Sequence, residues 1–241
     1  MTKGVSCIPK RCNITFDDCV NCSKCLPPAI LKTLRIHDHD AQRNTYWVSE
    51  LVGCLRKAYY KRKIPRDEYL TLEELYRMKR GTLLERIADS TGWRQLEGSI
   101  HCKVDGEDIK ITARLDCYDP EKRTIYELKS LQIRNARVLP RKKDVLQVRC
   151  YGLIFKDVFS EVKGLKIAYL DMNEFKVCDV GLEDMTEWVS QRVTALHRAS
   201  RDSQPPPKEE SYECRYCEYA SECPSQQILA LHTQIYSTQK T

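Results

Sequence analysis

The 241-residue sequence has no run of about 18 apolar residues, so no segment is long enough to span a bilayer as a helix. The amino terminus also lacks the apolar stretch of a secretory signal, and we therefore expect a cytoplasmic protein without membrane association. Neither sign of charge dominates, since 40 Lys and Arg against 34 Asp and Glu give a net charge of +6. This excess only suggests a polyanionic partner. With 41% hydrophobic and 31% charged residues, the chain is not a disordered tail either.

Cysteine is abundant, with 13 residues. An odd number without a secretion signal argues against a framework made only of disulfides, and clustered thiols in a reducing compartment more often bind metal. Disulfides of the kind found inside hyperthermophiles stay open for the scattered cysteines. The clustered ones are Cys19, Cys22 and Cys25 near one end and Cys214, Cys217 and Cys223 near the other, with Cys54 alone between them.

The pattern along the chain predicts three segments and a mixed α/β fold. Residues 1–44 are expected to form an irregular, Cys-rich N-terminal appendage, residues 45–224 the core, and residues 225–241 a tail helix. The core pattern predicts the order α-β-β-β-α-β, with a mixed sheet flanked by helices. Helices are expected from Ser49 through Tyr60, at 71–88, 144–156 and 182–201, and strands at 94–104, 109–119, 123–130, 164–172 and 174–180.

Two carboxylates and a lysine are expected to meet on one face of this sheet. Glu127 and Lys129 are two residues apart in one predicted strand and therefore share a face. A tight turn at residues 120–121 would pair Asp116 near Ile125 and leave Glu127 as its diagonal neighbour, roughly 5–8 Å away. Carboxylates at that spacing suit Mg²⁺ or Mn²⁺, and the lysine can assist a metal-bound water. A cross-strand salt bridge on a solvated face is the alternative.

Further polar residues flank this group. Glu85, on the preceding helix, is a candidate third carboxylate, and Gln147 and Tyr151 share a helix face at i and i+4. An amphipathic helix with a polar rim is the alternative for that pair. At these residues the chain resembles the RecB-like nucleases of the PD-(D/E)xK superfamily. The resemblance rests on the motifs G-x-x-x-E (Gly81, Glu85), Asp116, E-x-K (Glu127, Lys129) and Q-x-x-x-Y (Gln147, Tyr151).

The resemblance implies a restriction-endonuclease-like core and assigns roles to these residues. Glu85, Asp116, Glu127 and the carbonyl of Leu128 would hold the divalent metal, Lys129 would assist the attacking water, and Gln147 and Tyr151 would orient substrate or the lysine. Many close relatives have a histidine in place of Glu85, so this chain is expected to favour harder, all-oxygen coordination.

The cysteines on either side of the core extend the resemblance. Cys54 before it and Cys214-x2-Cys217-x5-Cys223 after it match the arrangement of the iron–sulfur subset of these nucleases, which includes the CRISPR-associated Cas-four exonucleases and the AddB-type repair nucleases. The segment VSELVGCLRKAYY resembles the first cysteine helix of the Cas-four family. This implies a 4Fe–4S cluster as a structural staple. By spacing alone, zinc or unliganded core thiols stay open.

The N-terminal Cys19-x2-Cys22-x2-Cys25 resembles part of a ferredoxin run, with Cys7 or Cys12 as the fourth ligand. Its spacing predicts a second metal site, and zinc, an iron–sulfur cluster, disulfides and free thiols all stay open for it.

A basic segment and several tyrosines are candidates for contact with nucleic acid. Residues 131–143 contain no acid and are expected to follow phosphates beside the metal site, the alternative being a solvated loop. Tyr59, Tyr60 and Tyr151 are candidates for stacking on unpaired bases. The basic residues of the segment are Arg134, Arg137, Arg141, Lys142 and Lys143.

The Cas-four resemblance implies a metal-dependent exonuclease on single-stranded DNA or DNA ends, commonly 5′ to 3′, that trims spacer precursors together with CRISPR integrase proteins. One alternative is a catalytically weak iron–sulfur subunit that measures or shields DNA ends. Another is the same nuclease in recombination, replication or repair of DNA in an archaeal virus or its host. The sequence leaves the oligomeric state open, a homo-oligomer included.

Overall fold

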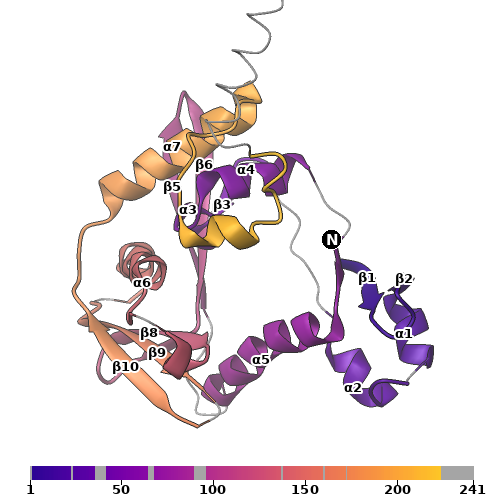
Figure 1. Ribbon diagram of the computed structural model, residues 1–241. Helices are drawn as coiled ribbons and strands as arrows, with labels where there is room; N and C mark the ends of the chain where they lie inside the picture. The colour runs from indigo at the N-terminus through magenta and orange to yellow at the C-terminus, as the bar shows by residue number, and fades with distance from the viewer. Residues whose placement is uncertain are drawn as a thin grey trace, which may run out of the picture.

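The computed structural model describes residues 2–22, 24–35, 42–64, 68–89, 96–136, 138–159, 161–171 and 173–223. In this part of the chain the fold is mixed α/β with three sheets. A long helix, α5 (Leu72–Asp89), connects a small N-terminal unit to the larger core (Figure 1). Among the described residues, no helix combines the length and apolar character needed to cross a bilayer. The predicted tail helix, Arg137 and the side chain of Glu85 lie outside the description.

The N-terminal unit is more regular than the sequence predicted. A hairpin of two strands is followed by two short helices, and a third strand from beyond residue 44 pairs parallel with the first. The expected irregular structure is wrong, because such short strands bury too few side chains, such as Val5, to show a period in the sequence. The elements are β1 (Thr2–Cys7), β2 (Cys12–Thr15), α1 (Phe16–Cys22), α2 (Pro28–Thr33) and β4 (Glu68–Leu70).

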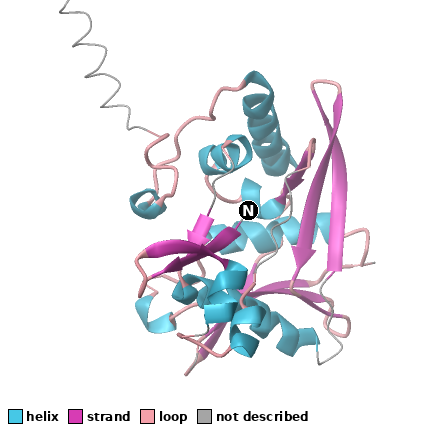
Figure 2. Ribbon diagram, turned by 90° about the vertical axis from the view of Figure 1, so that its right-hand side faces the viewer, coloured by secondary structure: helices cyan, strands magenta, loops and turns pink. Residues whose placement is uncertain are grey.

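Two sheets build the core, in the orders β3-β6-β5 and β10-β9-β8-β7. The antiparallel β5–β6 hairpin is the longest pair of strands in Figure 2. β3 is parallel to β6 and β8 is parallel to β9, so both sheets are mixed. The predicted second strand is therefore divided at Asp116, where the chain leaves one sheet and enters the other. The strands are β3 (Thr45–Trp47), β5 (Leu96–Val104), β6 (Glu107–Leu115), β7 (Cys117–Asp119), β8 (Thr124–Ser130), β9 (Gly164–Leu170) and β10 (Phe175–Val180).

The helix predicted from Ser49 onwards is interrupted. Its first part begins after Trp47 rather than at Ser49, and a break precedes the second part. The guanidinium of Arg192 donates to the carbonyl oxygens of Leu51 (2.9 Å from Nε) and Gly53, which satisfies carbonyls that a continuous helix would use internally. The helices of the core are α3 (Val48–Leu51), α4 (Leu55–Lys63), α6 (Lys142–Phe155) and α7 (Thr186–Asp202), with 3₁₀ turns at Ile133–Asn135 and Tyr212–Tyr216.

Other local predictions are confirmed. The capping box of α5 forms, since Thr71 N donates to Glu74 Oε2 (2.9 Å) and Glu74 N donates to Thr71 Oγ1 (3.2 Å). The β5–β6 turn has the left-handed φ angles of a tight hairpin, 51° at Asp105 and 88° at Gly106.

α6 contacts strands of both core sheets and buries Val148 completely, so this helix lies at the centre of the core.

Asp105 also ties the hairpin to α7. Its carboxylate accepts hydrogen bonds from Arg198 (2.6 Å from Nη2) and Arg201 (2.8 Å from Nη1), and these bonds, with the two positive charges, lower its pKa from 3.8 to about 2. A lowered pKa stabilises the fold above pH 4, and this contribution is lost as the pH falls towards 2. We expect Asp105→Asn, which tolerates the left-handed backbone, to lower stability at pH 7. In urea unfolding from pH 7 to 3 the difference from the wild type should shrink; a constant difference would contradict this.

Candidate active site

Asp116 lies in the bend between β6 and β7, where the two core sheets meet. Its Oδ2 accepts a hydrogen bond from the backbone N of Leu128 in β8 (2.7 Å). The β7–β8 register pairs Cys117 with Tyr126, and its continuation places Asp116 opposite Glu127, not near Ile125 as predicted. The reason is that a four-residue loop replaces the assumed two-residue turn. The expected convergence of the two carboxylates is thus present, and the pairing is more direct than predicted.

Glu127 is buried and forms an ion pair through Oε1 with Lys129 Nζ. Burial and the Asp116 charge raise the pKa of Glu127 to about 8. Burial alone would lower the pKa of Lys129, but the Glu127 carboxylate outweighs this and raises it. Glu127 Oε2 is buried with no hydrogen-bond partner among the described residues. An unsatisfied buried carboxylate oxygen is costly, and a hard cation would relieve that cost.

Lys129 is held from its other side by α6. Its Nζ donates to Gln147 Oε1 (3.1 Å), and Gln147 Nε2 donates to the hydroxyl of Tyr151 (2.6 Å). Burial, followed by the charges of Glu127 and Asp116, raises the pKa of Tyr151 well above its usual value, so this hydroxyl stays protonated. The structure therefore brings together five of the predicted site residues in one hydrogen-bonded group.

Sequence reasoning missed a second group that fixes the start of α6. The hydroxyl of Tyr169 in β9 donates to Asp144 Oδ2 (2.9 Å) and accepts from the backbone N of Arg141 (3.0 Å). Arg141 Nε completes the group by donating to the same Asp144 oxygen (2.7 Å). The only signal in the sequence is the i, i+3 spacing of Arg141 and Asp144. Tyr169 stands in an apolar strand and looks like an ordinary core residue.

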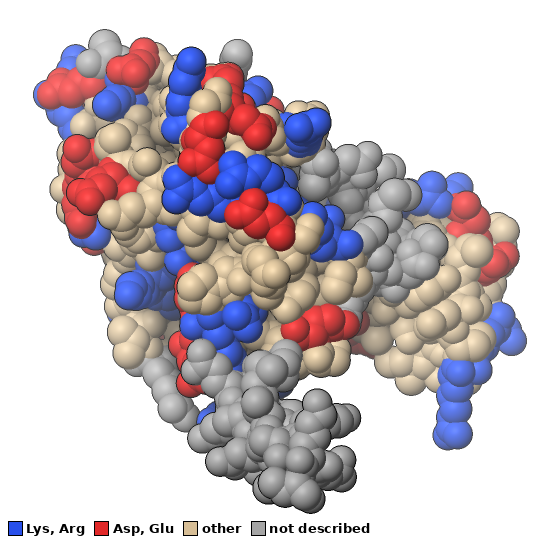
Figure 3. Space-filling model, turned by 90° about the horizontal axis from the view of Figure 1, so that it is seen from above, with Lys and Arg blue, Asp and Glu red and all other residues tan. Residues whose placement is uncertain are grey.

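Two arginines of the basic segment form ion pairs with carboxylates of the protein. Arg134 pairs with Glu174 (3.6 Å) and Arg141 with Asp144, so these two cations are already neutralised in part. On the face shown in Figure 3, lysines and arginines are interspersed with aspartates and glutamates rather than separated from them. Contact between the basic segment and phosphates stays a prediction.

The tyrosines predicted to stack on bases are buried in the protein or stacked on another tyrosine. Tyr59 and Tyr151 are buried, so neither ring is available, and the prediction is wrong for both. Tyr60 stacks on Tyr219 with ring centroids 6.0 Å apart, and its hydroxyl donates to the carbonyl of Glu222.

The oxygen donors at this junction suit a hard divalent cation, although the side chain of one predicted ligand, Glu85, lies outside the described residues. In the described part of the chain no three His, Cys, Asp or Glu side chains form a group that could hold a metal ion. α5, which carries Glu85, packs against β8, but the Glu85 side chain is outside the description. The N–H and C=O of a strand residue point to the same side, so the carbonyl of Leu128 faces the Asp116 side, as its N–H does. Asp116, Glu127 and this carbonyl are therefore three oxygen donors on one side of β8.

The four cysteines that flank the core line one cavity beside the start of α4. Cys54 stands at the N-cap of α4, and Arg56, two residues later, donates from Nη1 to Cys223 Sγ (3.6 Å). Ser211 N donates to Cys214 Sγ (3.5 Å). Cations line the same cavity and would offset the charge of a four-thiolate cofactor. The cavity is lined by Cys54, Cys214, Cys217 and Cys223 together with Arg56, Lys57 and Lys208, among others.

Comparison with known proteins identifies the superfamily and the fold. The family model of the PD-(D/E)XK nuclease superfamily matches residues 30–224. No curated protein sequence matches the chain. Among solved structures, that of SSO0001 has a TM-score of 0.60 and 21% identity, covering 80% of this chain and 93% of that one, which shows a shared fold. A phage-related exonuclease from Haemophilus somnus 129PT has a TM-score of 0.45 and 10% identity over 66% of this chain and 94% of its own.

Proposed function

The chain belongs to the PD-(D/E)XK nuclease superfamily, and from this premise we propose that it is a metal-dependent exonuclease that degrades single-stranded DNA or DNA ends from the 5′ end. The observation that carries the proposal is the group formed by Asp116, Glu127 and Lys129, which brings two carboxylates and an ammonium to the junction of the sheets. The polarity and a role in trimming spacer precursors with CRISPR integrase proteins are supported by the resemblance to the Cas-four family alone.

Each residue of the group has a chemical task in phosphodiester hydrolysis. Asp116 and Glu127, with the Leu128 carbonyl and Glu85, would hold Mg²⁺ or Mn²⁺, which when bound supplies charge neutralisation at the phosphate and a more acidic water. The ammonium of Lys129 stands beside the carboxylates, where it can orient the attacking water and stabilise negative charge on the phosphate. Gln147 limits the freedom of Lys129, and Tyr151 in turn limits that of Gln147.

We also propose that Cys54, Cys214, Cys217 and Cys223 bind a 4Fe–4S cluster. Their shared cavity and its cations support this, since four thiolates and a partly neutralised cluster charge are what such a cofactor needs. No cysteine of this set belongs to the group around Lys129, so the cluster would have a structural role.

The polarity can be tested by incubating the purified full chain with three kinds of single-stranded DNA. These are 3′-labelled linear strands with a free 5′ end, the same strands with a blocked 5′ end, and circles. With Mg²⁺ or Mn²⁺ we expect degradation of linear strands with a free 5′ end and no cleavage of circles, and chelation should stop the reaction. Asp116→Ala should abolish activity, because a metal ligand is lost. Asp179→Ala is the matched control: this exposed aspartate of β10 pairs with Lys166 (2.8 Å) away from the site.

Each alternative predicts another result. Cleavage of circles would show that the enzyme is an endonuclease. Equal degradation of strands with free and blocked 5′ ends would contradict the proposed 5′ to 3′ polarity. A folded wild type that binds DNA ends but never cleaves would favour the end-binding subunit. Full activity of folded Asp116→Ala would remove the site assignment altogether.

A further inference from the structure

The N-terminal unit has too small a core to hold its shape by apolar packing alone. In the described part of this unit, only six apolar side chains of its cluster are buried, with a few partly buried ones packed against them. The six are Val5, Cys19, Val20, Leu31, Leu34 and Leu75. Units of this size usually depend on disulfides or a metal ion in addition to their core. All cysteines of the chain are free thiols in the structure, so no disulfide supplies that support.

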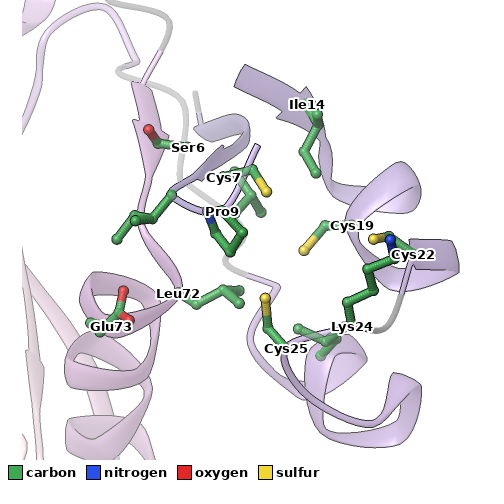
Figure 4. A pocket seen from close by; sticks show the side chains of 13 residues that line it. Ser6, Cys7, Pro9, Ile14, Cys19, Cys22, Lys24, Cys25, Leu72 and Glu73 are labelled. Atoms are coloured by element: carbon green, nitrogen blue, oxygen red, sulfur yellow. The ribbon is translucent and has the colours of Figure 1, made fainter. Parts of the chain in front are cut away.

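Four cysteines of this unit line one cavity. Cys7 ends β1, Cys19 and Cys22 lie on one face of α1 at i and i+3, and Cys25 follows in the segment before α2. Figure 4 shows their sulfur atoms directed into the same space. The cavity measures about 200 Å³, much more than the water-sized voids that close packing normally leaves. Apart from the thiols, Ser6, Lys24 and Glu73, the side chains that line it are apolar.

The thiols are close enough to influence one another. Cys7, Cys19, Cys22 and Cys25 line the same cavity, and several thiolates held together in it would repel each other. A divalent cation removes this repulsion, and binding by thiolates releases their protons.

We propose that Cys7, Cys19, Cys22 and Cys25 bind one structural zinc ion, a site separate from the nuclease centre and from the C-terminal cysteines. The order of elements supports zinc, because a β-hairpin followed by a helix with two ligands on one face is also the order of ββα zinc modules. Here the hairpin gives one ligand rather than two, and Cys25, after the helix, gives the fourth. In the described structure, no three of these thiols are arranged so that they could hold a metal ion together. Cys22 ends α1 and Cys25 lies between helices, so both can move inwards without breaking an element.

This zinc site would fix the start of α5. Leu72 and Glu73, in the first turn of α5, line the same cavity, and Leu75 belongs to the same small core. The far part of α5 carries Glu85 and the helix packs against β8. Zinc would therefore stabilise the connection between the N-terminal unit and the core.

Cys12 offers a matched control within the same hairpin. It is the strand partner of Cys7, but it is exposed and does not line the cavity. In the full chain we expect about one zinc per molecule by elemental analysis. Cys22→Ser and Cys25→Ser should lose most of that zinc, whereas Cys12→Ser should retain it. Cys217→Ser should also retain it, which separates this site from the C-terminal one.

Two further measurements keep the proposal testable if a variant folds poorly. In the wild type, bound zinc should protect Cys7, Cys19, Cys22 and Cys25 from alkylation until a chelator is added, while Cys12 reacts at once. Cobalt substituted for zinc should show the charge-transfer and visible bands of four-thiolate coordination. The zinc proposal would be overturned if Cys22→Ser lost iron and acid-labile sulfide, or if Cys7 and Cys12 formed a disulfide. It would also be overturned if Cys12→Ser lost as much zinc as the other variants, or if the wild type contained no zinc. None of these readouts depends on nuclease activity.

Discussion

Lys129→Met is expected to lower the single-turnover rate of DNA cleavage by about 10²–10³-fold, the usual cost of removing one donor that stabilises negative charge in the transition state. The substitution keeps the length of the side chain and removes the ammonium that now bridges Glu127 and Gln147. Because the carboxylates stay in place, binding of Mg²⁺ or Mn²⁺ should be preserved. The loss should therefore appear in the rate at saturating metal and DNA, not in the affinity for either.

Lys122→Met is the matched control, since this lysine lies in the β7–β8 loop with 69% of its side chain exposed. It should cleave at the wild-type rate. Calorimetric metal titration of both variants separates a chemical role of Lys129 from a structural one: weaker metal binding and an unchanged rate at saturating metal would contradict our assignment. Lys129→Arg is not expected to restore activity, because the planar guanidinium cannot replace a compact ammonium between two fixed acceptors.

Much of this site could be predicted from sequence because its residues lie in regular elements. Period two placed Glu127 and Lys129 on one face, and period 3.6 placed Gln147 and Tyr151 on another, and both pairs are found as expected. The register at Asp116 was missed because loop length decides it, and the loop at 120–123 has no strong turn signature.

Long-range contacts explain the other differences. The break between α3 and α4 depends on Arg192, which is about 140 residues away in the chain, so local propensity could not reveal it. The pairing of β4 with β1 and the contact of Tyr169 with Asp144 likewise join distant segments. Sequence periodicity reports which face of an element is buried, but not which distant partner covers it.

The break in the helix has a consequence for the C-terminal cysteines. It places Cys54 at the N-cap of α4, where the thiol faces the cavity shared with Cys214, about 160 residues later. Arg192 contacts both sides of that cavity, through the Leu51 and Gly53 carbonyls before Cys54 and through Glu209 before Cys214. One arginine thus positions both chain segments that carry the cysteines.

Cys217→Ser should remove most of the iron and acid-labile sulfide from anaerobically purified protein and bleach its brown colour. Loss of a cofactor bound only by the folded state should cost about 3 kcal/mol or more, a fall in Tm of roughly 6–12 °C for a chain of this size. Cys102→Ser, in β5 and outside both cysteine cavities, is the matched control and should keep iron and stability.

Nuclease activity separates a structural cluster from a catalytic one. Below its lowered Tm, Cys217→Ser should cleave DNA within a few fold of the wild type, since the cavity lined by the four cysteines contains none of Asp116, Glu127 and Lys129. Measuring metals in a Cys22→Ser background removes the contribution of the N-terminal cysteines to the total. Iron unchanged by Cys217→Ser would show that the ligands were chosen wrongly. Zinc in place of iron at these cysteines would show that spacing and cavity were right but the metal was not, because four thiolates accept either.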